Sequence, residues 1–178
     1  MAKAPISKGL RVLIVVWFRS RMGGLHLNVR DTIHSLTKRG HKVTLMCPPG
    51  DFAVSMALKG LTILPIDLED RAASVTVGLA AGPFDIVHAH PGHARATGLQ
   101  IAAACKAPFF ITLHGAWIDG VATYWRDCAG IFVVSGAVGD LVVKSKVCCK
   151  FGGWGGYVSL MDMTFFSFSS AFLCASHS

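Results

Sequence analysis

The pattern that most limits the fold lies in residues 11–47, where two apolar runs flank an amphipathic stripe. Residues 11–16 are one arginine followed by five apolar residues, which is typical of a strand buried on both faces of a parallel sheet. After the pair Gly23 and Gly24, apolar residues recur at helical spacing and predict an amphipathic helix that Gly40 ends. Residues 41–47 then begin by alternating polar and apolar, as a strand does. The stretch predicts a strand–helix–strand unit.

The same alternation continues to residue 144. Further strands are predicted at residues 61–66, 84–90, 109–114 and 131–134, and helices at residues 52–59, 68–81, 94–106, 117–126 and 135–144. Pro65 lacks the amide hydrogen that a sheet needs, which favours an edge position for the third strand. We therefore expect an α/β fold with an open, doubly wound, mostly parallel Rossmann-like sheet. Ligands of such sheets lie beyond the carboxyl ends of the strands.

The chain divides into three predicted segments. Residues 1–9 form a flexible N-terminus, residues 10–144 carry the alternating pattern, and residues 145–178 form an atypical tail without helical or strand period. Within the tail, residues 158–175 are mostly apolar but include Asp162. An aspartate at a bilayer centre costs about 2.5–3.5 kcal/mol. We expect a poorly ordered tail, with a membrane anchor as the alternative.

The net charge and the cysteine content indicate which partners and which cellular compartment to expect. The formal net charge of +7 favours anionic partners. The basic residues are scattered, with no run longer than Lys38–Arg39, so nucleic-acid binding is not expected. The six cysteines show no C-x-x-C spacing, as is usual for reduced thiols. We expect a cytoplasmic protein, with the inner face of the membrane as a candidate surface for peripheral contact.

The glycine pair Gly23–Gly24 is the first candidate site. It follows the first predicted strand and opens a helix, so that free backbone N–H groups could face a diphosphate without an obstructing side chain. A plain turn is the alternative interpretation. The fingerprint G-x-G-x-x-G is absent from this loop, which disfavours a nicotinamide cofactor, and we expect no cofactor.

Histidines end two of the predicted strands. His88, His90 and His93 have the spacing H-x-H-x-x-H, which overlaps the zinc motif of metallo-β-lactamase-like hydrolases. That motif has an aspartate directly before its third histidine, where this chain has Gly92. A zinc hydrolase is therefore a minor alternative, and no metal is expected. The other interpretation makes His88 a core histidine and lets His90 and His93 line a site.

His114 ends the fifth predicted strand and is the strongest single candidate. An imidazole there can donate a hydrogen bond to a sugar hydroxyl or a phosphate oxygen. Gly115 follows it and leaves room for a ligand to approach. Because parallel strands end at the same edge of a sheet, His114 is expected near His90 and the glycine pair.

Several short runs together resemble one family. They are Met22-Gly23-Gly24, Arg39-Gly40-His41-Lys42-Val43-Thr44, Phe84-Asp85-Ile86-Val87-His88-Ala89-His90, Thr112-Leu113-His114-Gly115 and Val133-Val134-Ser135. In order and spacing, residues 10–144 resemble the N-terminal domain of family-4 retaining glycosyltransferases. The resemblance implies one half of a GT-B fold, whose C-terminal domain mainly holds the nucleotide-sugar donor and whose N-terminal domain mainly holds the acceptor.

The resemblance also implies roles for single residues and a limit on what the chain can catalyse alone. It places Gly23 and Gly24 near the donor diphosphate, His114 near the transferred sugar, and His90 with its loop beside a sugar or lipid acceptor. The family's donor site uses two glutamates eight positions apart in the second domain, whereas this chain has one glutamate, Glu69. We therefore expect a truncated hexosyltransferase that is catalytically incomplete alone and needs a second domain. The alternative is a non-enzymatic Rossmann-like module that binds an anionic sugar, a nucleotide or a protein partner.

Overall fold

A seven-stranded parallel sheet forms the centre of the computed structural model, which describes residues 9–19, 23–90, 92–115, 121–144 and 157–160. Its order is β3-β2-β1-β4-β5-β6-β7, and all six pairings are parallel. The strands are β1 (Arg11–Val15), β2 (Lys42–Cys47), β3 (Leu61–Pro65), β4 (Ile86–Ala89), β5 (Phe109–Leu113), β6 (Gly130–Val133) and β7 (Tyr157–Leu160). The six predicted strands and the doubly wound fold class are confirmed. The sequence did not lead us to expect β7, which lies within the predicted tail.

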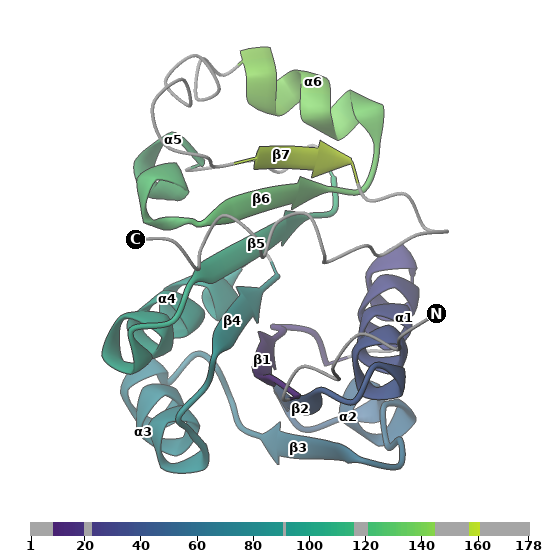
Figure 1. Cartoon of the computed structure of the whole chain (residues 1–178), viewed down its shortest axis with the longest axis vertical. Coiled ribbons are helices and arrows are strands. Elements are labelled where there is room, and N and C mark those ends of the chain that lie inside the picture. The colour runs from purple at the N-terminus through teal and green to yellow at the C-terminus, as the bar shows by residue number, and fades with distance from the viewer. Residues whose placement is uncertain (1–8, 20–22, 91, 116–120, 145–156, 161–178) are drawn as a thin grey trace, which may run out of the picture.

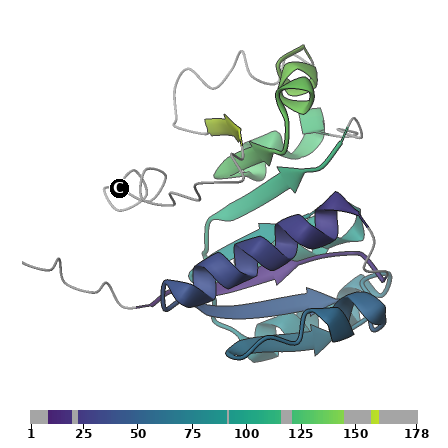
Figure 2. The ribbon, with the colours of Figure 1, turned by 90° about the vertical axis from the view of Figure 1, so that its right-hand side faces the viewer.

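Helices cover both faces of this sheet (Figure 1). They are α1 (Gly24–Lys38), α2 (Asp51–Ser55), α3 (Arg71–Ala81), α4 (His93–Cys105), α5 (Val121–Tyr124) and α6 (Gly136–Lys144), with a 3-10 turn η1 (Trp125–Asp127). Figure 2 shows α1 lying along the neighbouring strands on one face of the sheet. Helices α3 and α4 pack against each other on the opposite face, where α4 contacts β1, β4 and β5.

The predicted amphipathic stripe explains the position of α1. Val29, Ile33 and Leu36 are fully or almost fully buried, and they pack against the apolar side chains of β1 and β2. On the other face α4 approaches the sheet closely at Gly98. A Cβ atom added there would lie 3.1 Å from Phe109 Cε2, so an alanine would require the neighbouring side chains to shift by a few tenths of an ångström.

Two helix boundaries in the described ranges differ from the sequence prediction by three residues or more, and a local hydrogen bond explains one of them. Helix α3 begins at Arg71 because the Asp70 carboxylate caps it, accepting a hydrogen bond from the Ala73 amide at 3.0 Å. Residues 68–70 therefore lead into the helix. Helix α2 ends at Ser55, four residues before the predicted end. Pro65 ends β3 at the sheet edge, as predicted.

The strand order determines where a ligand can bind. From β1 the chain adds β2 and β3 on one side, and then β4 to β7 on the other. The loops that follow β1 and β4 therefore leave the sheet in opposite directions. A crevice opens between them at the carboxyl ends of these two strands. In the described ranges no helix is both long and apolar enough to cross a membrane. Residues 158–175, for which a membrane anchor was the alternative to a poorly ordered tail, lie almost entirely outside those ranges.

Candidate functional site

The loops after β1 and β4 meet at the switch point of the sheet. The His90 amide donates to the Val15 carbonyl at 2.9 Å, which ties the end of β4 to the end of β1. Helix α1 begins after the β1 loop, α4 begins after the β4 loop, and His114 follows β5. All six predicted site residues therefore belong to segments that follow β1, β4 and β5 at the carboxyl edge of the sheet.

The glycine pair forms the uncapped start of α1. Gly23 is the N-cap residue with φ 91° and ψ −179°, a conformation that strongly favours glycine, and no side chain caps the helix. Gly24 is its first residue. A Cβ atom built at either position would have no neighbour within 4 Å among the described atoms. Both glycines are exposed and no side chain caps this 15-residue helix, so an anion at its start would meet the positive end of the helix dipole.

His90 and His114 form a direct ring-to-ring hydrogen bond. His90 Nδ1 lies 2.7 Å from His114 Nε2, and the two rings stack with centroids 4.9 Å apart. The His90 side chain is completely buried, whereas His114 is half-buried. The resemblance implied that His90 and its loop border the acceptor. In this structure the His90 ring is buried against His114, because β4 and β5 are neighbours and end together.

Burial keeps these rings neutral. It lowers the pKa of His114 to about 4. Burial, followed by the charge that a protonated His114 would carry, lowers the pKa of His88 to about 3. The pKa of His90 is also held well below its ordinary value, by burial first and then by His88 and His114. The pair at the edge of the sheet can therefore offer a hydrogen bond at neutral pH, but no positive charge.

His88 is a core histidine. Its Nε2 atom lies 2.7 Å from Thr112 Oγ1, and its ring contacts Phe132 edge-on. The zinc alternative required His88, His90 and His93 to converge, and they do not. His93 heads α4 with its exposed ring against Trp17, at a centroid distance of 4.8 Å. Across the described part of the chain, no group of three or more histidine, cysteine or acidic residues could hold a metal ion.

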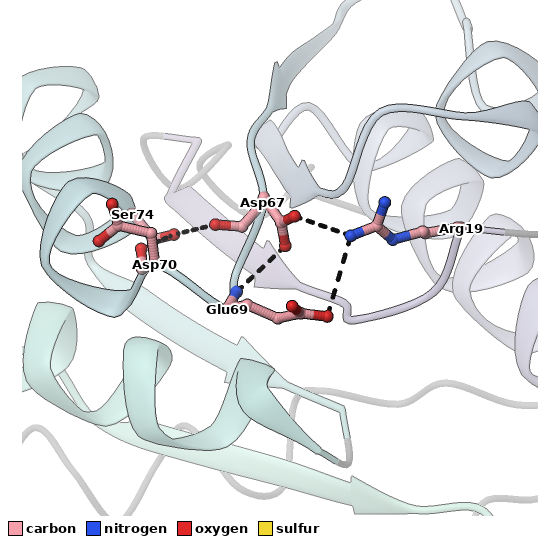
Figure 3. A network of polar contacts seen from close by, with 5 residues as sticks. All are labelled: Arg19, Asp67, Glu69, Asp70 and Ser74. Carbon is pink, nitrogen blue, oxygen red and sulfur yellow. Dashed lines mark hydrogen bonds and ion pairs between the residues drawn. The ribbon is translucent and has the colours of Figure 1, made fainter.

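An exposed ion-pair network joins the β1 loop to the β3 loop (Figure 3). Arg19 Nη2 lies 2.7 Å from an Asp67 carboxylate oxygen and 3.9 Å from Glu69 Oε1. The Glu69 amide donates to Asp67, and the Ser74 hydroxyl donates to the Asp67 and Asp70 carbonyls. The one glutamate of the chain thus contributes to a structural contact. These partners were missed because 48 residues separate Arg19 from Asp67.

Sequence reasoning also missed the pairing of the histidines. A signal was present, because both strands end in a polar residue, one intervening residue and a histidine: His88-x-His90 and Thr112-x-His114. In each case the side chain on or directly after β4 bonds the residue 24 positions later, on or directly after β5. Neighbouring parallel strands with matching polar positions can form such diagonal contacts.

A doubly wound parallel sheet with an open helix start at its switch point defines a Rossmann-like α/β domain. The family model described as Glycosyltransferase Family 4 matches residues 22–148, and the chain belongs to this family. Among curated proteins no sequence match was found. The matched range contains every predicted site residue.

Solved structures of glycosyltransferases share the fold. HepE from Anabaena, crystallised with UDP and glucose, superposes with a TM-score of 0.65 at 14% identity, covering 85% of this chain and 42% of that one. A glycosyltransferase from Rickettsia africae gives 0.63 at 15% identity, with 76% and 39% covered. MurG from Acinetobacter baumannii gives 0.55 at 15% identity, with 70% and 41% covered. The chain thus spans about two fifths of the length of these structures and has the fold of one half of a GT-B enzyme.

Proposed function

We propose that this chain is the N-terminal, acceptor-side domain of a glycosyltransferase that transfers a hexose from a nucleotide sugar. The observation that carries the proposal is the family match over residues 22–148, which includes helices α1 to α6 and every proposed site residue. The open start of α1 and the neutral donor at His114 give that edge the chemistry that the activity needs.

Each site residue has a proposed role. The N–H groups at Gly23 and Gly24 face the donor diphosphate, where the helix dipole favours negative charge. His114 donates a hydrogen bond to the transferred sugar, and Gly115 lets the sugar approach, because a Cβ atom added there would meet no atom within 4 Å. His93 borders the acceptor, and His90 acts from behind His114. A neutral imidazole suits the hydroxyl of a sugar better than it suits a phosphate, which would gain more from a cation.

A second domain is the main proposed partner. A departing diphosphate must be stabilised by preorganised charge. Arg19 lies in the described part of the carboxyl edge, but its charge is already paired with Asp67 and Glu69 and so is not free to stabilise a diphosphate. A few hydrogen bonds, each worth about 0.5–1.5 kcal/mol, must also offset several kcal/mol of lost freedom on association. We therefore expect the chain alone to bind nucleotide sugars with dissociation constants no tighter than about millimolar and to show no turnover.

The decisive test adds a methyl group where a ligand should lie. Gly24→Ala and Gly115→Ala place a Cβ in open space, so both variants should fold like the parent chain. In NMR titrations with UDP-glucose and a panel of other nucleotide sugars, we expect both to weaken binding several-fold. Gly136→Ala is the matched control, because Gly136 also opens a helix and also has no atom near its Cβ position.

Three results would contradict the proposal. One is the absence of any nucleotide-sugar binding at millimolar ligand, and another is unchanged binding in Gly24→Ala. The third concerns incompleteness: turnover by the chain alone at ordinary enzyme rates, abolished in His114→Ala, would show that no second domain is needed. Binding that never leads to transfer, even with a donor domain supplied, would favour the non-enzymatic module.

We also propose a cytoplasmic location with peripheral contact to the inner face of the membrane. The net charge of +7 supports this proposal, because anionic lipids attract basic proteins. Co-sedimentation with vesicles that contain phosphatidylglycerol, compared with neutral vesicles, tests it. Equal binding to both kinds of vesicle, or none to either, would contradict it.

A further inference from the structure

The bond between His90 and His114 needs one proton, and the two rings can supply it in two ways. A neutral imidazole carries a single N–H, on either Nδ1 or Nε2. In the first arrangement His114 Nε2–H donates to His90 Nδ1, and the proton of His90 then lies on its own Nε2. In the second, His90 Nδ1–H donates to His114 Nε2, and the proton of His114 lies on Nδ1. The distance of 2.7 Å is the same in both.

Burial of His90 distinguishes the two arrangements. Its Nε2 atom is buried and has no hydrogen-bond partner within the described structure. The first arrangement would therefore bury an unpaired N–H, whereas the second leaves only an unpaired lone pair at that atom. Orphaned buried donors are the rarer of the two in proteins. The second arrangement is favoured, and it places a proton on Nδ1 of the half-buried His114.

We propose that His90 is a positioning residue that holds His114 as the Nδ1–H tautomer and fixes its ring, so that His114 presents a neutral donor to an oxygen of the sugar. The ligand part of this inference rests on the proposed function. Nothing in it requires His90 to touch the ligand, which agrees with the complete burial of its side chain. The rings stack at an interplanar angle of 28°, so the contact fixes the orientation of His114 as well as its tautomer.

The neighbouring pair on the same strands provides an internal comparison. His88 Nε2 and Thr112 Oγ1 form the equivalent diagonal bond one pleat earlier, also at 2.7 Å. A threonine hydroxyl can both donate and accept, so it imposes no tautomer on its partner. At His114, by contrast, the hydrogen-bond partner is a second imidazole with a single proton, and the other nitrogen of that imidazole is buried and unpaired within the described structure.

The test reads the tautomer directly on the full chain. In histidine labelled with ¹⁵N, protonated and unprotonated ring nitrogens resonate far apart, and the His114→Gln variant assigns the signals of His114. We expect a protonated Nδ1 and an unprotonated Nε2 at His114. A protonated Nε2 at His114 in the parent chain would overturn the proposal without any variant.

Two variants separate positioning from general packing. His90→Phe keeps a ring but removes the donor, so the two nitrogen shifts of His114 should move toward each other as its tautomers mix. Thr112→Val is the matched control; it breaks the equivalent bond of His88 and should leave the signals of His114 in place. A His90→Phe spectrum with the tautomer of His114 unchanged would overturn the proposal. If His90→Phe does not fold, the tautomer of His114 in the parent chain still tests the proposal by itself.

Ligand binding supplies the second readout. With UDP-glucose as probe, loss of one oriented hydrogen bond in His90→Phe should weaken binding between about two- and tenfold. Equal affinity of the parent and His90→Phe would overturn the role of the positioned donor. Failure of the parent to bind nucleotide sugars would contradict the proposed function instead, because the tautomer is measured without ligand.

Discussion

Three buried neutral histidines should make this domain sensitive to mild acid. In the unfolded chain each of these rings titrates near pH 6.5. In the folded chain the pKa is lowered to about 3 for His88 and to about 4 for His114, and it also lies well below its ordinary value for His90. Below pH 6.5 these three rings alone therefore let the unfolded state bind up to three more protons than the folded state. The free energy of unfolding falls as the pH falls, from about 6.5 down toward 4.

The expected loss follows from the proton count. One proton of difference changes the free energy of unfolding by about 1.4 kcal/mol per pH unit, so three protons change it by about 4 kcal/mol per unit. One unit below the unfolded pKa, at pH 5.5, the domain should thus be about 4 kcal/mol less stable than at pH 8. Native domains are stable by about 5–15 kcal/mol, so this loss is a large share of the total.

Urea unfolding followed by tryptophan fluorescence between pH 8 and 5.5 measures this slope. His114→Gln removes one of the three groups and should lower the slope by about a third. Ile111→Val is the control, because shortening a buried side chain on the same strand costs about 0.5–1.5 kcal/mol at every pH alike. A slope below about 1.4 kcal/mol per pH unit, or one that His114→Gln leaves unchanged, would refute the reasoning.

Three further predictions concern stability. Gly92→Ala and Gly23→Ala force alanine into similar backbone conformations at helix N-caps, at a cost of about 1–3 kcal/mol each. Only at Gly92 would the new Cβ lie 2.6 Å from the Trp17 ring, and forcing that ring off its rotamer should make Gly92→Ala cost about 0.5–1.5 kcal/mol more in urea unfolding. That excess should vanish in a Trp17→Ala background, and its persistence there would contradict the clash. Thr112→Val leaves a buried ring nitrogen unpaired and should cost about 1–3 kcal/mol, and a neutral result would show that the bond contributes nothing. Arg19→Gln breaks an exposed ion pair and should cost less than about 1 kcal/mol, with a difference that shrinks at high salt; a larger or salt-independent cost would show a contact of another kind.

The sequence by itself determined the fold, because hydrophobic periodicity is a local property. Five apolar residues after Arg11 can be satisfied only by burial on both faces of a sheet, and the spacing of Val29, Ile33 and Leu36 allows only one buried helix face. The proline at position 65 was enough to place β3 at the edge. The positions of Gly23 and His114 followed as well, since every parallel strand of such a sheet ends at the same edge.

Only the tertiary structure decided how these residues act on one another. Which strands are neighbours depends on non-local pairing, and the pairing of β4 with β5 made His90 a buried hydrogen-bond partner of His114. The same holds for Arg19 and Asp67, which the sequence separates and the strand order brings together. Protonation is the clearest case. A histidine in a sequence has an ordinary pKa, and only the water excluded by the packed sheet lowers it, because desolvation disfavours the charged ring.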